Sequence, residues 1–424
     1  MSILNKLFSN SMIYIISLLF NKGLSFVLLP VLTFYLSKED YGVLGFVTAM
    51  STIASIYIGF FPSVFLLSKY AQYGKERISE YIHHILLLTI STFFLVLLIL
   101  FGLKDFILPE AIVKKNLIIV VITCYALFTV FFNFLDTLFQ VEKNAIKFAI
   151  LQTVQSVGAL GLALILIIEF SYGWKGKYYA ELAILFFIFL FTIYYIIKNK
   201  YYKFNTNFKK LKEVTFFLFP ITFTVLGLYI MGTIDRIFVA DMIGLEAAGI
   251  YNVAIIMAVI INMVYDSIIK AFNPILYESY SDRSGQSRKK IVKIIYAYSL
   301  ICVIVLAGYI FFLPYVFHLM INDKFSEALE LIPVLALGFT FEGLRKGLES
   351  QLVFNNKVKS LAVITLIASL TNIVLNYFLI KIYGIQGAAY ATAIAFFVLY
   401  ILTFILFSKN NNLPWLLKNK KESI

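Results

Sequence analysis

Long apolar runs dominate the chain and set its pattern of elements. A helix that crosses the hydrocarbon core of a bilayer needs about 20 mainly apolar residues. Runs of about that length, bounded by charged or turn-forming residues, recur along the chain with only short segments between them. They predict twelve transmembrane helices, approximately at residues 10–36, 41–68, 82–103, 116–139, 148–169, 178–197, 214–240, 247–276, 294–320, 331–354, 361–380 and 387–407. We therefore expect an all-α polytopic membrane protein.

The composition leads to the same fold class. Of the 424 residues 61% are hydrophobic and 14% are charged, and the mean hydropathy is +0.90. A soluble domain is about 25% charged, so this chain has too little polar surface for two or three soluble domains. A soluble globular protein and a disordered chain are both excluded. The first apolar run is too long for a signal-peptide core, so we expect a retained helix.

Lysine and arginine are distributed unevenly between the two sides of the predicted helices. With the N-terminus inside, 23 basic residues fall on the inner side and 8 in the outer loops. This asymmetry predicts that both termini are cytoplasmic. Tyrosine and lysine are also typical of an interface, so the basic, Tyr-rich stretch 198–212 does not indicate nucleic-acid binding.

The chain repeats itself at a nearly constant offset. Three short matches relate the first six predicted helices to the last six, with offsets of about 210 residues: Gly42 to Gly249, Asn144 to Asn356, and Gly176 to Gly387. Six helices per half give both halves the same topology, related by an axis along the membrane normal. We expect an N-terminal lobe at 1–197, a cytoplasmic linker at 198–213, a C-terminal lobe at 214–407 and a cytoplasmic basic tail at 408–424.

Among the charged residues inside the predicted helices, ten are candidates for function. Each costs about 2.5–3.5 kcal/mol near the bilayer centre, so these side chains are expected to line an internal cleft or to pair with one another. The basic residues are Lys22, Arg236, Lys270, Arg345 and Lys346, and the acidic residues are Asp136, Asp235, Asp266, Glu342 and Glu349.

The densest group lies in the run 331–354. Glu342, Arg345, Lys346 and Glu349 fall within about 100° of one another on a helix. Their spacing predicts two ion pairs at i,i+4, Glu342 with Lys346 and Arg345 with Glu349. The charged face is expected to line the cleft.

Other intramembrane charges have simpler explanations beside a functional one. Asn262, Asp266, Lys270 and Asn273 form one stripe on the run 247–276. Lys22 has no acid within one turn, so we expect its ammonium group to meet water, another helix or an anionic ligand. Lys270, Asp136 and Glu349 lie toward the cytoplasmic ends, where their polar groups could reach the interface, and Asp235 with Arg236 could be a structural pair.

Catalytic chemistry has little support in the sequence. His83, His84 and His318 form neither a metal-ligand set nor a dyad with a nucleophile. Cys124 and Cys302 lie far apart, and no phosphate-binding glycine loop occurs. We expect no enzyme activity, no metal and no cofactor, so binding and translocation are the remaining functions.

Two motifs resemble a known family. The stretch Leu28–Phe46 resembles the first signature of the polysaccharide transporter family, the O-antigen flippases of the multidrug/oligosaccharidyl-lipid/polysaccharide exporter superfamily. The stretch Asp235–Tyr251 resembles the signature of the second half, and Tyr383–Thr392 resembles the turn between the last two helices. The family usually has a basic residue where this chain has Phe34.

The resemblance implies a function. Members of the family move an undecaprenyl-diphosphate-linked oligosaccharide from the inner to the outer leaflet of the bacterial inner membrane. They do so by alternating access of a cationic cleft between two six-helix lobes. The five intramembrane cations, Lys22, Arg236, Lys270, Arg345 and Lys346, suit a diphosphate and become candidate substrate-binding residues. The five acids are candidates for proton coupling, with Glu342 first and Asp266 second. A polysaccharide polymerase and a chain-length regulator would be partners in that pathway.

Other classes of membrane protein fit less well. A major-facilitator transporter also has six plus six helices, and Asp282-Arg283-Ser-Gly285 resembles its inner-loop motif, but Glu278 replaces the expected glycine. A drug exporter of the same superfamily is a further alternative. A membrane polysaccharide polymerase is disfavoured because the sequence has no large outer loop.

Overall fold

A computed structural model gives the fold. It describes residues 13, 17, 20, 21, 23, 24, 26, 28–59, 62–109, 115–281, 285–355 and 357–409. The described residues form α-helices and one short 3-10 helix. Their bounds are α2 Leu29–Tyr35, α3 Lys38–Tyr57, α4 Pro62–Gly102, α5 Lys104–Ile107, α6 Lys115–Val141, α7 Ala145–Ile168, α8 Trp174–Lys198, α9 Phe208–Met242, α10 Leu245–Ser281, α11 Gly285–Met320, η1 Asp323–Phe325, α12 Ala328–Phe354, α13 Val358–Tyr383 and α14 Ile385–Lys409.

The helices confirm the predicted fold class. Among the described residues, eight helices are long and apolar enough to cross a membrane, or up to nine if a bent helix pair counts as one span. Every predicted run from 41–68 onward lies on one or two of the helices above. Most of the first run, 10–36, and most of the tail 408–424 lie outside the described residues. The protein is an all-α, multi-pass membrane protein.

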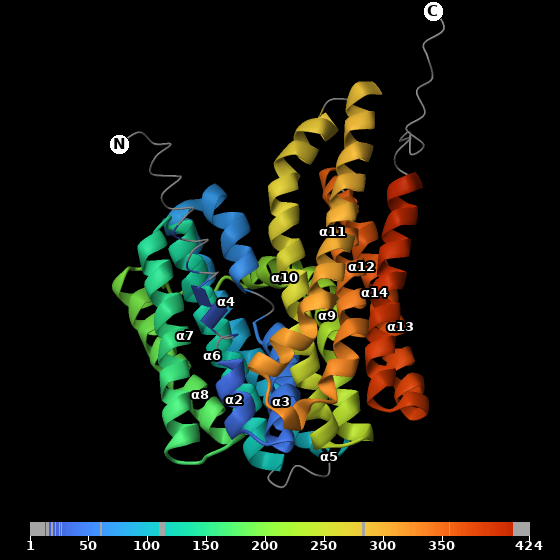
Figure 1. The fold of residues 1–424 in the computed structure, drawn as a ribbon. Helices are drawn as coiled ribbons and strands as arrows, with labels where there is room; N and C mark the ends of the chain where they lie inside the picture. The colour runs from blue at the N-terminus through green and yellow to red at the C-terminus, as the bar shows by residue number, and fades with distance from the viewer. Residues whose placement is uncertain are drawn as a thin grey trace, which may run out of the picture. The chain divides into compact units, whose positions relative to one another are not determined.

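The chain forms two compact units. The first contains Met1–Tyr229 and Gly244–Gly249, and the second contains Ile230–Ile243 and Ile250–Ile424. In the first unit α7 packs on α8, while α3, α4 and α8 all pack on α6 (Figure 1). In the second unit α12 packs on α11 and α14, and α14 packs on α13. Each unit therefore has one central helix, α6 or α12. Both helices hold charged residues of the predicted spans, although α12 is not among the eight helices counted above.

Asp40 ties two helix starts together in the first unit. Its backbone N–H donates to the Ser37 hydroxyl at 3.0 Å, and its carboxylate accepts from the Ser37 N–H at 3.1 Å, which makes a capping box for α3. The same carboxylate accepts from the Trp174 N–H at 3.0 Å, at the start of α8. A Cβ on Gly173 would lie 2.8 Å from this carboxylate. Helix capping therefore accounts for Ser37 and Asp40 in the stretch Leu28–Phe46.

Gly42 and Gly249, which the internal repeat matches, each lie against the start of the other's helix. A Cβ on Gly42 would overlap the backbone of Leu245, and a Cβ on Gly249 would overlap the backbone of Lys38. All four residues belong to the first unit, because the turn 244–249 groups with it. Only glycine permits backbones to approach this closely. The repeated motif is therefore a reciprocal helix crossing.

The second predicted helix is broken. The run 41–68 predicts one span, but α3 ends at Tyr57 and a new helix begins at Pro62, with a 48° bend between them. Gly59 has a φ of +81°, which favours glycine, and proline is compatible with a first helical turn. The Gly59 N–H donates to the Thr92 hydroxyl on α4 at 2.9 Å, so the break has a hydrogen-bond partner inside the protein.

The segment between α8 and α9 and the first turns of α9 are held within the first unit by polar contacts. Tyr201 donates to Glu142 at 2.6 Å, and Glu213 accepts from Tyr81 at 2.7 Å and from Tyr73 at 3.1 Å. Glu80 pairs with Lys203 at 3.3 Å and also with Lys210. Burial and the nearby Glu142 carboxylate raise the pKa of Tyr201, so this phenol remains a donor.

Candidate functional site

The second unit gathers charged residues on one face of α12, the helix that contains the predicted span 331–354. Arg345 is 5% exposed and is held between two carboxylates of its own helix. Its Nε and Nη2 atoms donate to the two oxygens of Glu342 at 2.7 and 2.8 Å, and Nη2 lies 3.1 Å from Glu349. The predicted pair Arg345–Glu349 is confirmed. The geometry is the bidentate fork that arginine makes and lysine does not.

Lys346 pairs with a neighbouring helix. Its Nζ atom lies 2.6 Å from Asp266 Oδ1 and 2.6 Å from Asn262 Oδ1, both on α10. The predicted pair of Glu342 with Lys346 is wrong, because Glu342 is engaged by Arg345 at i,i+3. One turn further along α12, Ser350 donates to Asn273 at 2.8 Å. Three members of the predicted α10 stripe therefore bind the charged face of α12.

Two buried tyrosines fix the position of α12. A Cβ on Gly343 would lie 2.5 Å from the Tyr265 ring, and a Cβ on Gly347 would lie 2.9 Å from the Tyr298 ring. The Tyr298 hydroxyl donates to the Gly343 carbonyl at 2.8 Å, and the Tyr265 hydroxyl donates to the Cys302 carbonyl at 2.9 Å. The rings of α10 and α11 thus fit against the glycine face of α12, and the charged side chains project beside them.

The other predicted residues of the second unit lie outside this cluster. Lys270 is exposed. Asp235 is fully buried and accepts from Tyr251 at 2.6 Å and from Thr392 at 3.2 Å. The backbone N–H of Arg236 donates to Asp235 at 2.8 Å, whereas its guanidinium Nε is buried with no hydrogen-bond partner within the described part of the chain. Asp235 is therefore held by hydroxyl groups.

Asp136 lies in a separate polar cluster in the first unit. Its two oxygens accept from the side-chain amides of Gln140 and Gln152, each at 2.9 Å. Ser156, one turn beyond Gln152, contacts Asn21. No cation pairs with Asp136 among the described residues. Lys22 lies outside the described residues, as do Asp282 and Arg283 of the major-facilitator-like motif.

Several residues of these clusters escaped the sequence analysis. Gln140, Gln152, Ser350, Tyr265 and Tyr298 are polar residues that occur often in membrane helices, and their spacing gave no signal. Gly343 and Gly347 could have been found, because two small residues four apart indicate close packing on one face of a helix. No group of three histidine, cysteine or acidic residues that could hold a metal ion occurs among the described residues.

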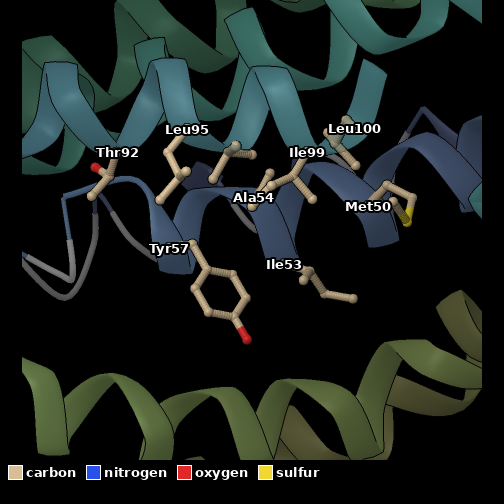
Figure 2. A pocket seen from close by; sticks show the side chains of 9 residues that line it. Met50, Ile53, Ala54, Tyr57, Thr92, Leu95, Ile99 and Leu100 are labelled. Atoms are coloured by element: carbon tan, nitrogen blue, oxygen red, sulfur yellow. The ribbon is translucent and has the colours of Figure 1, made fainter. Parts of the chain in front are cut away.

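Two apolar grooves are found among the described residues of the first unit. One has a volume of about 460 Å³ and lies between α3 and α4, beside the helix break. Figure 2 shows Leu95 and Ile99 of α4 facing Ala54 of α3, with Tyr57 at one side. The other groove, of about 390 Å³, is lined by residues of α6, α7 and α8 and includes Lys147.

Family models match the chain over most of its length. The model described as polysaccharide biosynthesis protein matches residues 7–280, and the MatE model matches residues 220–378. The first match covers the broken second helix and the Asp136 cluster, and the second covers the charged face of α12. The two matches overlap between residues 220 and 280.

Two known proteins and several solved structures are similar to this chain. Two proteins of Haemophilus influenzae, Lsg locus putative protein 1 and an uncharacterized membrane protein, are 20% and 25% identical over 66% of this chain and 68% and 67% of their own. The lipid II flippase MurJ in an inward closed conformation has a TM-score of 0.74 at 14% identity, over 95% of this chain and 88% of that one. An inward-facing multidrug resistance MATE transporter of the MOP superfamily has a TM-score of 0.72 at 14% identity, over 92% and 94%. The chain has the fold of these transporters, and it belongs to the polysaccharide biosynthesis protein family.

Proposed function

We propose that the protein is a flippase for an undecaprenyl-diphosphate-linked oligosaccharide, which it moves from the cytoplasmic to the periplasmic leaflet of the inner membrane. The observation that carries the proposal is the charged face of α12, on the predicted span 331–354, where Arg345 and Lys346 are paired with three carboxylates. Charged residues inside a membrane are costly and mark the path of a polar substrate or an ion. Family membership supports the same substrate class.

Arg345 and Lys346 have complementary roles in this proposal. Among the described residues the contacts of Arg345 use Nε and Nη2, which leaves the donors of Nη1 for a phosphate oxygen. Lys346 is partly exposed, with 15% of its side chain accessible, and its ammonium group has a third N–H besides those used by Asn262 and Asp266. A diphosphate would compete with the carboxylates for these donors. Binding would then rearrange the ion pairs, which is the differential interaction that alternating access requires.

Asp136 is the stronger candidate for proton coupling. A carboxylate in a membrane helix is costly unless it is paired or protonated. Glu342 is paired bidentately with Arg345, whereas the partners of Asp136 within the described residues are the neutral amides of Gln140 and Gln152. Neutral donors allow Asp136 to take up a proton without breaking an ion pair. The first choice from the sequence, Glu342, is therefore a structural partner of Arg345 in this proposal.

Drug export is the second candidate function. The MatE model matches residues 220–378, and several multidrug transporters have the same fold. If the protein is a drug exporter, a strain that lacks it should be sensitive to drugs while its surface polysaccharide remains normal.

A deletion strain tests the proposal. We expect loss of the surface polysaccharide and accumulation of the lipid-linked repeat unit on the cytoplasmic side. The wild-type gene should reverse both changes. Normal polysaccharide in the deletion strain would contradict the proposal.

A further inference from the structure

The groove on α6, α7 and α8 has features of a lipid site. It lies within one unit, on three helices that are long and apolar enough to span the membrane. Apart from Lys147 and Tyr195, its lining is aliphatic or phenylalanine. Ile150 is 58% exposed and Phe187 is 66% exposed, so the groove is open along its length. A hydrocarbon chain is the ligand that such a lining fits.

A lysine stands at one end of this groove. Lys147 is in the first turn of α7, where its N–H donates to the Asn144 cap at 3.1 Å. Its Nζ atom lies 5.1 Å from the centre of the Tyr195 ring and 5.7 Å from that of Phe139, and it donates to the Tyr195 hydroxyl at 3.3 Å. The two rings hold the ammonium group in place by cation–π contacts.

The neighbouring acid does not neutralise this lysine directly. Both oxygens of Glu142 accept from phenols, one from Tyr195 at 2.7 Å and the other from Tyr201 at 2.6 Å. Lys147 forms no ion pair within the described part of the chain. Lys198, at the end of α8, lies 5.1 Å from the ring of Tyr194 and adds a second cation near the same end of the helices. The mouth of the groove therefore suits an anionic head group.

The internal repeat shows that this arrangement belongs to the first half alone. Lys147 corresponds to Lys359 at an offset of 212, but Phe139 corresponds to Gln351 and Tyr195, at an offset of 211, to Leu406. Phe187 and Phe191, which line the groove, correspond to Val398 and Leu402. The aromatic cage around the lysine is thus not a by-product of the repeated fold.

We propose that this groove binds one acyl chain of an anionic glycerophospholipid from the cytoplasmic leaflet, with the lipid phosphate held by Lys147. The leaflet follows from the positive-inside topology, which places the turn at 142–144 in the cytoplasm. Phosphate and ammonium form charge-assisted hydrogen bonds, while the chain lies along Ile150 and Phe187. The site lies apart from the charged face of α12 and does not depend on the flippase function.

Native mass spectrometry of the purified full-length protein tests the proposal. The protein is incubated with phosphatidylglycerol or with phosphatidylcholine of identical chains. We expect one tightly retained phosphatidylglycerol, with retention about fivefold lower in Lys147→Gln, which corresponds to one lysine near a membrane surface. The control Lys359→Gln, at the repeat-related position, should retain the lipid as the wild type does.

A second pair of variants tests the apolar part. Ile150→Trp fills the groove and should abolish retention, whereas Ile146→Trp, on an exposed position of α7 outside the lining, should not. Size-exclusion profiles check that all four variants are folded. Equal retention of the two lipids, or equal effects of Lys147→Gln and Lys359→Gln, would overturn the proposal. Displacement of phosphatidylglycerol by an equal amount of undecaprenyl phosphate would also overturn it, in favour of a prenyl lipid.

Discussion

Lys346 on α12 and Asp266 on α10 form an interhelical ion pair, with Nζ 2.6 Å from Oδ1. The pair joins two helices that the sequence marks separately as carrying polar stripes. Asp266 keeps 43% of its side chain accessible and Lys346 keeps 15%. The pair is therefore open enough to exchange its partner for a substrate anion, and it is close enough to contribute to helix packing.

The stability of this pair is open to a double-mutant cycle. Lys346→Met should lower the apparent melting temperature, because Asp266 loses its cation. Methionine is similar to lysine in side-chain length, so the packing is largely kept. Partial exposure of Asp266 limits the coupling energy to about 1 kcal/mol. The double variant Lys346→Met/Asp266→Leu should lose less stability than the sum of the losses in the two single variants. Lys270→Met, on the exposed side of α10, is the control and should leave the melting temperature unchanged. Additive effects would show that the two side chains are not coupled.

Arg345 is expected to respond differently to alanine and to lysine. Arg345→Ala leaves Glu342 and Glu349 without their cation in the membrane, which costs about 3–5 kcal/mol and should reduce the amount of folded protein. Arg345→Lys keeps the charge but loses the bidentate fork, so we expect near-normal protein in the membrane and only partial surface polysaccharide.

Immunoblots of membranes and polysaccharide staining measure the two effects for Arg345. The double variant Arg345→Ala/Glu342→Gln should recover protein level without recovering polysaccharide. Full polysaccharide from that double variant would remove Arg345 from the substrate site.

Only part of this site could be predicted from the sequence. Helical spacing gives the pairing of Arg345 with Glu349, because both residues are on one helix. It does not determine whether Lys346 bonds within α12 or to α10, since that choice depends on how Tyr265 and Tyr298 fit against Gly343 and Gly347. Hydrophobic runs likewise locate the second helix but not its break, for which Gly59 and Pro62 were the only local signals.

Asp136 and Glu342 should have separable effects on coupling. In proteoliposomes with an imposed pH gradient, Asp136→Asn should bind lipid-linked oligosaccharide but no longer respond to the gradient, because the amide cannot take up a proton. Glu342→Gln should instead lower stability or binding, since Arg345 loses its bidentate partner, and the remaining activity should still respond to pH. Unchanged pH-driven flipping by Asp136→Asn would exclude it as the coupling group.

The reciprocal glycine crossing predicts a strong effect of small side chains. Gly42→Val or Gly249→Val places a branched side chain where the backbone of Leu245 or Lys38 lies, so the helix starts must separate. We expect loss of monodisperse protein in fluorescence size-exclusion chromatography. Gly161→Ala on α7 is the control, because a Cβ there would meet open space. Wild-type profiles for both valine variants would mean that the crossing is not required for folding.

Translocation itself is the most direct test of the account. Purified protein is reconstituted into liposomes that contain fluorescent undecaprenyl-diphosphate-linked oligosaccharide, and an impermeant reagent that modifies the sugar reports its appearance on the opposite leaflet. We predict protein-dependent translocation in the wild type, and translocation lowered at least tenfold in Arg345→Lys at equal protein per vesicle. Translocation no faster than in protein-free liposomes, under a pH gradient and with monodisperse wild-type protein, would contradict the proposed function.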